Sequence, residues 1–123
     1  MWPDFLYNEM SEKSSLISLK ENYEFVRAYR RGKSYVSPVL VAYVFKNRKK
    51  SNRVGITTSK KIGKAVKRNR ARRVIRAAYR NLSQQCKQGY DIVFVARTRT
   101  AYVKSTEVQK HMELLLNKAG ILD

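Results

Sequence analysis

The chain has 123 residues, of which 27 are Lys or Arg and 9 are Asp or Glu, so its formal net charge is +18. Its length is that of one domain, its 43% hydrophobic share supports a folded core, and no apolar run reaches the roughly 20 residues of a membrane span. One Cys and one His exclude an internal disulfide and a Cys- or His-based zinc site, while the charge indicates a polyanionic partner, nucleic acid before a membrane surface or an acidic protein.

The first residues contain Asp4 and lack a basic start followed by a long apolar stretch. We therefore expect no signal peptide and a reducing, cytoplasmic location. Residues 1–18 mix polar and apolar side chains, and we expect a poorly ordered tail there. The remaining residues, 19–123, are predicted to form a single domain.

The first predicted element is a helix over Asn22–Arg31. Asn22 is the expected N-cap, and Gly32 is expected at the C′ position that ends the helix. Phe25 and Tyr29 are four residues apart, so they share one helix face.

A strand region is predicted over residues 35–45, with Pro38 marking a break or the strand start. Both faces of this region are apolar, so we expect the sheet to be covered on both sides. Residues 46–53 form a basic turn, and residues 53–58 form a second strand. The pattern therefore predicts a hairpin over residues 35–58.

A long basic helix is predicted within residues 59–82. No acid occurs between Glu24 and Asp91, although these 66 residues hold 20 of the 27 basic side chains. An exposed helix normally mixes charges, so the neutralising charge is expected to come from a partner. The core stripe follows helical spacing: Ala71, Val74, Ile75, Ala78 and Leu82. The opposite arc carries Arg68, Arg72, Arg73, Arg76 and Arg80, with Asn69 between them, and Lys64 and Lys67 lie at the helix start.

A buried strand is predicted over residues 91–97, and a closing helix over residues 105–119. Ser105 or Thr106 is the expected cap of this helix, and Gly120 its end. Its apolar face comprises Val108, Met112, Leu115, Leu116 and Ala119. The order α-β-β-β-α-β-α predicts an α/β fold, a small α+β sandwich.

The most specific motif begins at Arg53 with RVGI and continues from Ser59 with SKKIGKAVKRNR. A strand here runs into a Gly-containing turn and then into a helix dense with Arg. Backbone N–H groups at a helix start favour phosphate, and Arg side chains bind phosphate oxygens in pairs. Asn69 is a poor helix former without charge, so we predict that it makes hydrogen bonds in the site.

This ordered pattern resembles the protein subunit of bacterial ribonuclease P, whose signature is the Arg-Asn-Arg helix. The resemblance extends over roughly residues 19–116. It implies the non-catalytic subunit of a ribonucleoprotein endoribonuclease that removes the 5′ leader of precursor tRNA. It further implies that the catalytic RNA binds the Mg²⁺ ions, while the protein raises substrate affinity and lowers the magnesium requirement. A left-handed βαβ crossover is also implied, against the general right-handed rule.

The resemblance implies two RNA contacts. The set that binds the RNA subunit is Lys60, Lys61, Lys64, Lys67, Arg68, Asn69, Arg70, Arg72, Arg73 and Arg76. The leader cleft, between the first helix and the sheet, comprises Phe25, Tyr29, Val41 and Tyr43. The residue pattern favours the same cleft, because aromatic side chains beside basic groups suit single-stranded bases.

No catalytic residue and no metal site are expected in the protein itself. His111 is predicted on a helix surface, Cys86 as an incidental thiol, and Asp91 as a strand-start residue. We expect the catalytic RNA and precursor tRNA as partners, no membrane, and no obligate protein partner. A ribosomal protein or another structural RNA-binding protein is the alternative interpretation, and it predicts RNA binding without stimulation of tRNA processing.

Overall fold

The computed structural model describes residues 17–122, so the predicted tail lies outside the described residues except for its last two. Those two residues are not a tail, because they form a short strand beside β4. The strands are β1 (Ile17–Ser18), β2 (Lys33–Val36), β3 (Leu40–Lys46), β4 (Arg53–Thr57) and β5 (Tyr90–Ala96). The α-helices are α2 (Asn22–Arg31), α3 (Ala65–Leu82) and α4 (Ser105–Lys118). Three 3₁₀ turns are η1 (Lys60–Ile62), η2 (Ser83–Gln85) and η3 (Thr98–Tyr102).

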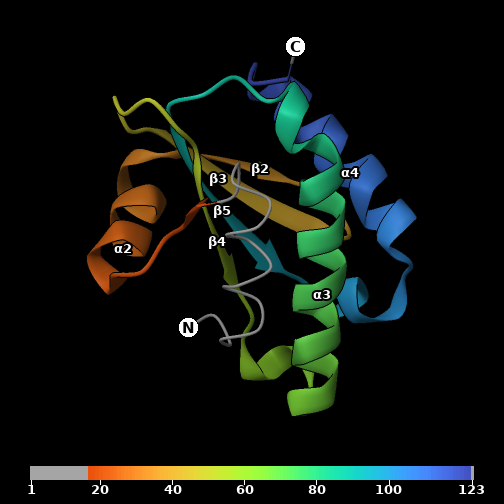
Figure 1. The fold of residues 1–123 in the computed structure, drawn as a ribbon. Helices are drawn as coiled ribbons and strands as arrows, with labels where there is room; N and C mark the ends of the chain where they lie inside the picture. Colours follow the sequence, from red (N-terminus) through yellow and green to blue (C-terminus); the bar gives the residue numbers. More distant parts are fainter. Residues whose placement is uncertain (1–16, 123) are drawn as a thin grey trace.

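The five strands form one sheet in the order β1-β4-β5-β3-β2. β3 runs antiparallel to β2 and β5, whereas β4 runs parallel to β5 and β1. α2 covers one face, and α3 and α4 cover the other (Figure 1). The predicted α+β sandwich and its element order are confirmed, with β1 as an addition. None of the helices within residues 17–122 is long and apolar enough to cross a membrane.

The connection β4–α3–β5 has an unusual hand. In Figure 1 both strands run downward, β4 lies in front of β5, and α3 lies to their right. This arrangement is a left-handed crossover, as the resemblance implies and contrary to the rule for parallel strands.

The strand region predicted over residues 35–45 consists of two strands, β2 and β3, with the break at Pro38 that the sequence indicated. Ser37 turns the chain: its Oγ accepts hydrogen bonds from the N–H groups of Val39 (3.2 Å) and Leu40 (3.0 Å). Pro38 lies inside this turn, and β2 and β3 form the hairpin.

The predicted hairpin over residues 35–58 is wrong, because β5 lies between β3 and β4. Ile92, Val93 and Phe94 of β5 are each 0% exposed. The most buried strand therefore takes the centre of the sheet, where both of its faces are covered, and separates β3 from β4.

The helix caps precede the predicted ones, by one residue for Asn22 of α2 and by one or two residues for Ser105 or Thr106 of α4. The N-cap of α2 is Glu21, which shares a reciprocal capping box with the glutamate at the third helical position. The N-cap of α4 is Lys104. In both helices the predicted cap already has helical conformation.

Gly32 ends α2 as predicted, but not through a left-handed backbone. Its φ is −78°, which any residue can adopt. The requirement for glycine is steric, because a Cβ would lie 2.5 Å from the Ala28 carbonyl oxygen and 2.8 Å from that of Val44. The close approach of α2 to β3 therefore depends on Gly32.

Two cores hold the layers together. The larger lies between the sheet and α3 with α4, and it contains every residue of the predicted α3 stripe. Of the predicted apolar face of α4, the first four residues are 0% exposed and Ala119 is half-buried. The smaller core lies under α2 and comprises Leu19, Phe25, Ala28 and Val93.

Candidate nucleic-acid interface

The entrance to the basic helix is a structured turn. The Oγ of Ser59 accepts a hydrogen bond from the Lys61 N–H (3.3 Å) and begins η1. Gly63, with φ +134°, reverses the chain, and Lys64 is the N-cap of α3. The lysines of this turn are exposed. They therefore surround the helix end at which free N–H groups attract anions.

The predicted RNA-binding set is not uniformly exposed along α3. Lys60, Lys61, Lys64, Asn69 and Arg73 are exposed, and Lys67, Arg68, Arg70 and Arg72 are half-buried. Arg76 is only 8% exposed, so its predicted position on the open arc is wrong. The buried arc of α3 extends past the predicted stripe to Tyr79 (3% exposed). Arg76 and Tyr79 are three residues apart, so Arg76 lies on the same buried side of α3 as Tyr79.

The three residues of the Arg-Asn-Arg motif differ in their hydrogen bonds. The Arg68 guanidinium donates a hydrogen bond to the Gly63 carbonyl (2.8 Å). Arg70 donates to the carbonyls of Ala101 (2.9 Å) and Val103 (3.1 Å), which fastens α3 to η3. Asn69, between them, is exposed and makes no side-chain hydrogen bond with residues 17–122. Its predicted hydrogen bonds therefore need a partner molecule.

The sequence reasoning did not identify Tyr102 of η3, which lies beside this surface. Tyr102 is 62% exposed, and the Lys67 ammonium lies 4.1 Å from the centroid of its ring. An exposed aromatic ring next to cations offers a stacking surface for a base. The signal was present in the sequence as a tyrosine within the basic segment 97–104.

On the other face of the sheet, α2 and β3 bring Tyr29 and Tyr43 together. Their ring centroids are 4.9 Å apart at an interplanar angle of 76°. The Tyr29 hydroxyl shares a 2.7 Å hydrogen bond with the Thr57 hydroxyl of β4. Val41 lies in register with Val95, which in turn faces Thr57. Three of the four predicted cleft residues therefore meet on one partly open face.

The fourth predicted cleft residue, Phe25, belongs to the core. It is 8% exposed, and its ring lies over Gly55 of β4. A Cβ at Gly55 would come within 2.4 Å of this ring. Phe25 therefore fixes the distance between α2 and the sheet.

A buried ion cluster closes one end of the same face. Asp91 is 0% exposed and accepts hydrogen bonds from Arg53 (2.8 and 2.9 Å), Asn47 (2.8 Å) and Arg27 (3.3 Å). Arg53 also pairs with Glu24. The sequence reasoning placed Asp91 at a strand start but did not identify this role. The two acids that bracket the acid-free stretch thus share Arg53.

Both carboxylates are ionised at neutral pH. Burial raises the pKa of Asp91, but hydrogen bonds from Arg53 and Asn47 outweigh burial and hold this pKa below its ordinary value. Burial also raises the pKa of Glu24, and hydrogen bonds from the backbone N–H groups of Glu21 and Lys20, together with Arg53, lower it to a larger extent. The charge of Arg53 is therefore balanced inside the protein.

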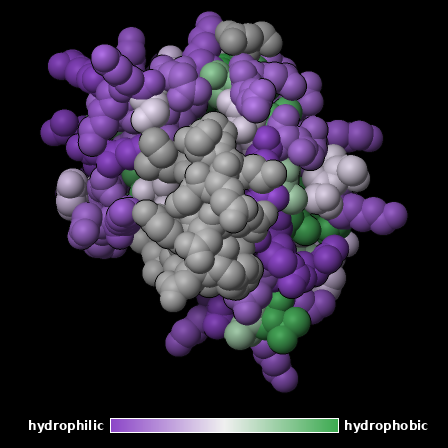
Figure 2. Space-filling model, in the orientation of Figure 1, coloured by the Kyte–Doolittle hydropathy of each residue, from purple (hydrophilic) through white to green (hydrophobic). Residues whose placement is uncertain are grey.

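Hydrophilic residues predominate over the described part of the face shown in Figure 2, with hydrophobic patches among them on the side where α3 lies. Comparison with known proteins identifies the family of this chain. A family model described as Ribonuclease P matches residues 14–120. The chain belongs to the ribonuclease P protein family.

Relatives and solved structures agree with this family. The ribonuclease P protein component of Clostridium botulinum (strain Loch Maree / Type A3) is 47% identical over 104 residues, covering 84% of this chain and 94% of the relative. The RNase P protein of Staphylococcus aureus superposes with a TM-score of 0.77 at 30% identity, covering 86% of this chain and 97% of that one. The Thermotoga maritima protein gives 0.74 at 28% identity, covering 82% and 96%.

Two side chains with catalytic potential in this ribonuclease P protein, His111 and Cys86, have local partners. His111 lies on α4 with its Nε2 3.4 Å from a Glu107 carboxylate oxygen. Cys86 is 5% exposed, and its thiol donates to the Leu82 carbonyl (3.4 Å). Within residues 17–122, no three His, Cys, Asp or Glu side chains converge on a metal position.

The ion cluster predicts a loss of stability in acid. Asp91 and Glu24 have folded pKa values below their ordinary 3.8 and 4.5, so their contribution is complete above the unfolded values and disappears as pH falls through the folded values. We expect the free energy of unfolding to fall when the pH is lowered below about 4. Urea titrations across this range measure it, and Asp91→Asn should weaken the dependence. An unchanged free energy down to about pH 3 contradicts the assignment.

Proposed function

We propose that this protein is the protein component of ribonuclease P, the ribonucleoprotein that removes the 5′ leader of precursor tRNA. One observation carries the proposal: in this ribonuclease P family member, the Arg-Asn-Arg helix and the turn before it present exposed cations, such as Lys61, Lys64 and Arg73, that form no ion pair with residues 17–122. The proposed partner is RNA. The proposed location is the cytoplasm, where precursor tRNA is available.

The surface for the RNA subunit is formed by η1 and the first half of α3. Lys60, Lys61, Lys64 and Arg73 are exposed and form no ion pair with residues 17–122. Folded RNA crowds phosphates together, and these cations reduce that repulsion and lower the need for Mg²⁺. Log affinity should fall by about 0.7–0.9 per log unit of salt for each phosphate contact. An affinity that is nearly independent of salt argues against this surface.

The leader is proposed to lie in the cleft between α2 and β3. Tyr29 and Tyr43 offer ring faces and edges to bases, and Val41 supplies an apolar floor. Stacking tolerates every base, which suits a leader whose sequence varies from one precursor to another.

The catalytic groups and the Mg²⁺ ions are assigned to the RNA subunit. The family supports this assignment. Glu24 of α2 and Asp91 of β5 are already engaged with Arg53. What the protein contributes in this proposal is substrate affinity and charge neutralisation.

The cleft makes a specific prediction for Tyr43→Ala. Loss of one stacking partner should weaken binding of precursor tRNA by about 1–3 kcal/mol, because a base loses its aromatic contact. Binding of mature tRNA, which has no leader, should not change. Equilibrium binding of both RNAs to the reconstituted enzyme measures the difference. Equal losses for both RNAs refute the cleft assignment.

Reconstitution tests the function as a whole. The purified protein is mixed with a bacterial ribonuclease P RNA at low Mg²⁺, and leader removal from a precursor tRNA is followed. Cleavage should require the RNA and increase strongly with the protein. Tight RNA binding without stimulation favours the alternative, a ribosomal or other structural RNA-binding protein.

A further inference from the structure

Tyr102 is the last residue of η3, the 3₁₀ turn that precedes α4. It is 62% exposed, although Ala101 just before it is 2% exposed. An aromatic ring contributes to stability mainly through the apolar area that it removes from water, so a ring left this open adds little to the fold. The ring of Tyr102 is therefore available to a partner molecule.

The backbone that carries Tyr102 is held from two sides. Arg70 of α3 donates hydrogen bonds to the carbonyls of Ala101 (2.9 Å) and Val103 (3.1 Å), the two chain neighbours of Tyr102. The hydroxyl of Thr100, which is 0% exposed, donates a hydrogen bond (2.5 Å) to the carbonyl just before β3. A tyrosine side chain has only two rotatable bonds, so a ring on this fixed backbone loses little freedom when a partner binds.

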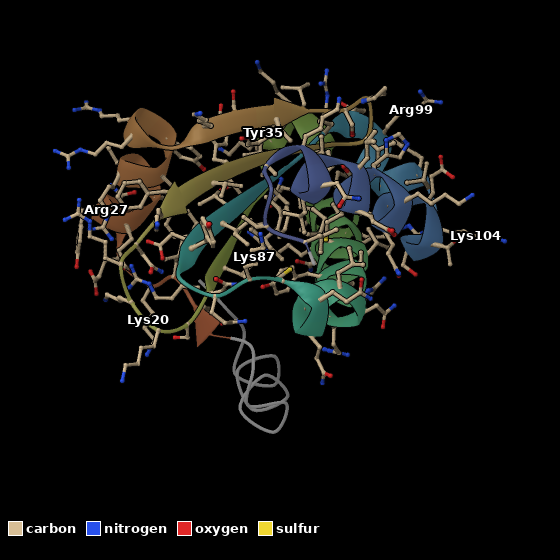
Figure 3. The ribbon with its side chains drawn as sticks, turned by 90° about the horizontal axis from the view of Figure 1, so that it is seen from above. Lys20, Arg27, Tyr35, Lys87, Arg99 and Lys104 are labelled. Carbon is tan, nitrogen blue, oxygen red and sulfur yellow. The ribbon has the colours of Figure 1, made fainter. Side chains whose placement is uncertain are left out.

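Cations surround the ring. The Lys67 ammonium lies 4.1 Å from the ring centroid, so one face of the ring carries this cation and the other can accept a base. Arg99 and Lys104 are close to Tyr102 in the chain, are exposed, and form no ion pair with residues 17–122. In Figure 3 both lie on the side of α3 and α4, whereas Arg27 of α2 lies on the opposite side. Aromatic rings among cations are the combination that binds unpaired nucleotides.

The ring adjoins the proposed surface for the RNA subunit. Lys67 belongs to the first half of α3, and η3 packs against both α3 and η1. The proposed leader cleft lies on the other face of the sheet, the face that α2 covers (Figure 1). RNA that contacts η1 and the first half of α3 is therefore within reach of Tyr102, and a leader in the cleft is not.

We propose that Tyr102 and Lys67 form a stacking site for an unpaired base of the RNA subunit, with Arg70 as its positioning residue. The base is unpaired because sequence-tolerant stacking on an aromatic side chain needs a base that is free of its own duplex. Tyr102 supplies the ring, Lys67 holds an adjacent phosphate, and Arg70 acts through the carbonyls on either side of Tyr102. The inference rests on the proposed function, because it adds a base contact to the same RNA-binding surface.

The first test measures binding to a bacterial ribonuclease P RNA alone, without precursor tRNA. Tyr102→Ala should weaken binding about tenfold with an unchanged salt slope, because stacking releases no counterions. Tyr102→Phe keeps the ring and should bind as the wild type does. Tyr23→Ala is the matched control and should leave the affinity unchanged. Tyr23 is 63% exposed and its ring centroid lies 5.9 Å from the Arg27 guanidinium, but it belongs to α2.

A double-mutant cycle tests the positioning role of Arg70. Lysine keeps the charge, but its single ammonium group does not reproduce the planar fork that holds two carbonyls. Arg70→Lys should lose about as much affinity as Tyr102→Ala, and the combined variant should lose little more than either one. Additive losses mean that Arg70 contacts the RNA by itself, and they overturn its positioning role.

The outcomes separate this inference from the proposed function. If the wild type does not bind the RNA, the proposed function itself fails. If the wild type binds and Tyr102→Ala matches it, the stacking site is overturned while the α3 surface stands. An equal loss in Tyr23→Ala or Tyr102→Phe, or a reduced salt slope in Tyr102→Ala, also overturns it. The Tyr102 variants change an exposed side chain, so they decide the stacking site even where Arg70→Lys lowers the thermal midpoint.

Discussion

Replacing Lys61, Lys64 and Arg73 together by alanine is expected to weaken binding of the ribonuclease P RNA at least a hundredfold at about 0.1 M salt. Each phosphate contact contributes about 0.7–0.9 log units of affinity under these conditions, and three contacts contribute more than two. The three side chains are exposed and lie at η1, at the N-cap of α3 and on its open face. Filter binding across a salt series measures both the affinity and its slope.

The matched control removes the same number of charges elsewhere. Lys87, Lys110 and Lys118 are exposed and lie outside the predicted RNA-binding set. Their triple alanine variant should bind RNA nearly as well as the wild type, with an unchanged slope. If both triple variants lose the same affinity, net charge alone drives binding and the α3 surface has no special role.

The second large effect concerns stability. Arg53→Met is expected to lower the free energy of unfolding by about 3–5 kcal/mol, because it leaves Asp91 and Glu24 buried without their shared cation. Asp91 is 0% exposed and Glu24 is 5% exposed, so water cannot replace the lost partner. Urea denaturation monitored by circular dichroism measures the change.

Two further variants give this prediction its controls. Arg30→Met removes an exposed arginine from α2 and should change stability by less than about 0.5 kcal/mol. Arg53→Met combined with Asp91→Leu and Glu24→Gln removes the stranded charges and should recover much of the loss. A single Arg53→Met variant as stable as the wild type means that the cluster does not support the fold.

The sequence predicted those parts of the fold that depend on local pattern. The α3 stripe from Ala71 to Leu82 repeats at helical spacing, and all of its members are buried. The strand over residues 91–97 was also predicted, because its apolar run leaves no polar face. In both cases neighbours in the chain decide the structure.

The features that the sequence did not predict depend on contacts between residues that are distant in the chain. The pairing of β3 with β5 instead of β4 depends on which strand buries both faces, which no hairpin pattern reveals. The Asp91–Arg53 pair depends on parallel register across 38 residues. The burial of Arg76 depends on how far the packing of α3 extends around the helix, to Tyr79.

The sequence likewise predicted part of the candidate site. The pair Tyr29 and Tyr43 followed from the spacing of residues on one helix and one strand, and the structure brings the rings together. Phe25 was placed in the cleft by the same spacing, but its position above Gly55 makes it a core residue. The roles of these residues in RNA binding stay predictions until the variants are measured.

The central position of β5 has a consequence for synthesis. The strand that joins β3 to β4 is Tyr90–Ala96, which follows both strands and α3 in the sequence. While the chain emerges from the ribosome, β3 and β4 are complete early but have no common neighbour. We therefore expect the basic helix α3 to be accessible to cellular RNA before the sheet that supports it can close. Assembly of the sheet through such distant contacts is also slower than the folding of a helical bundle.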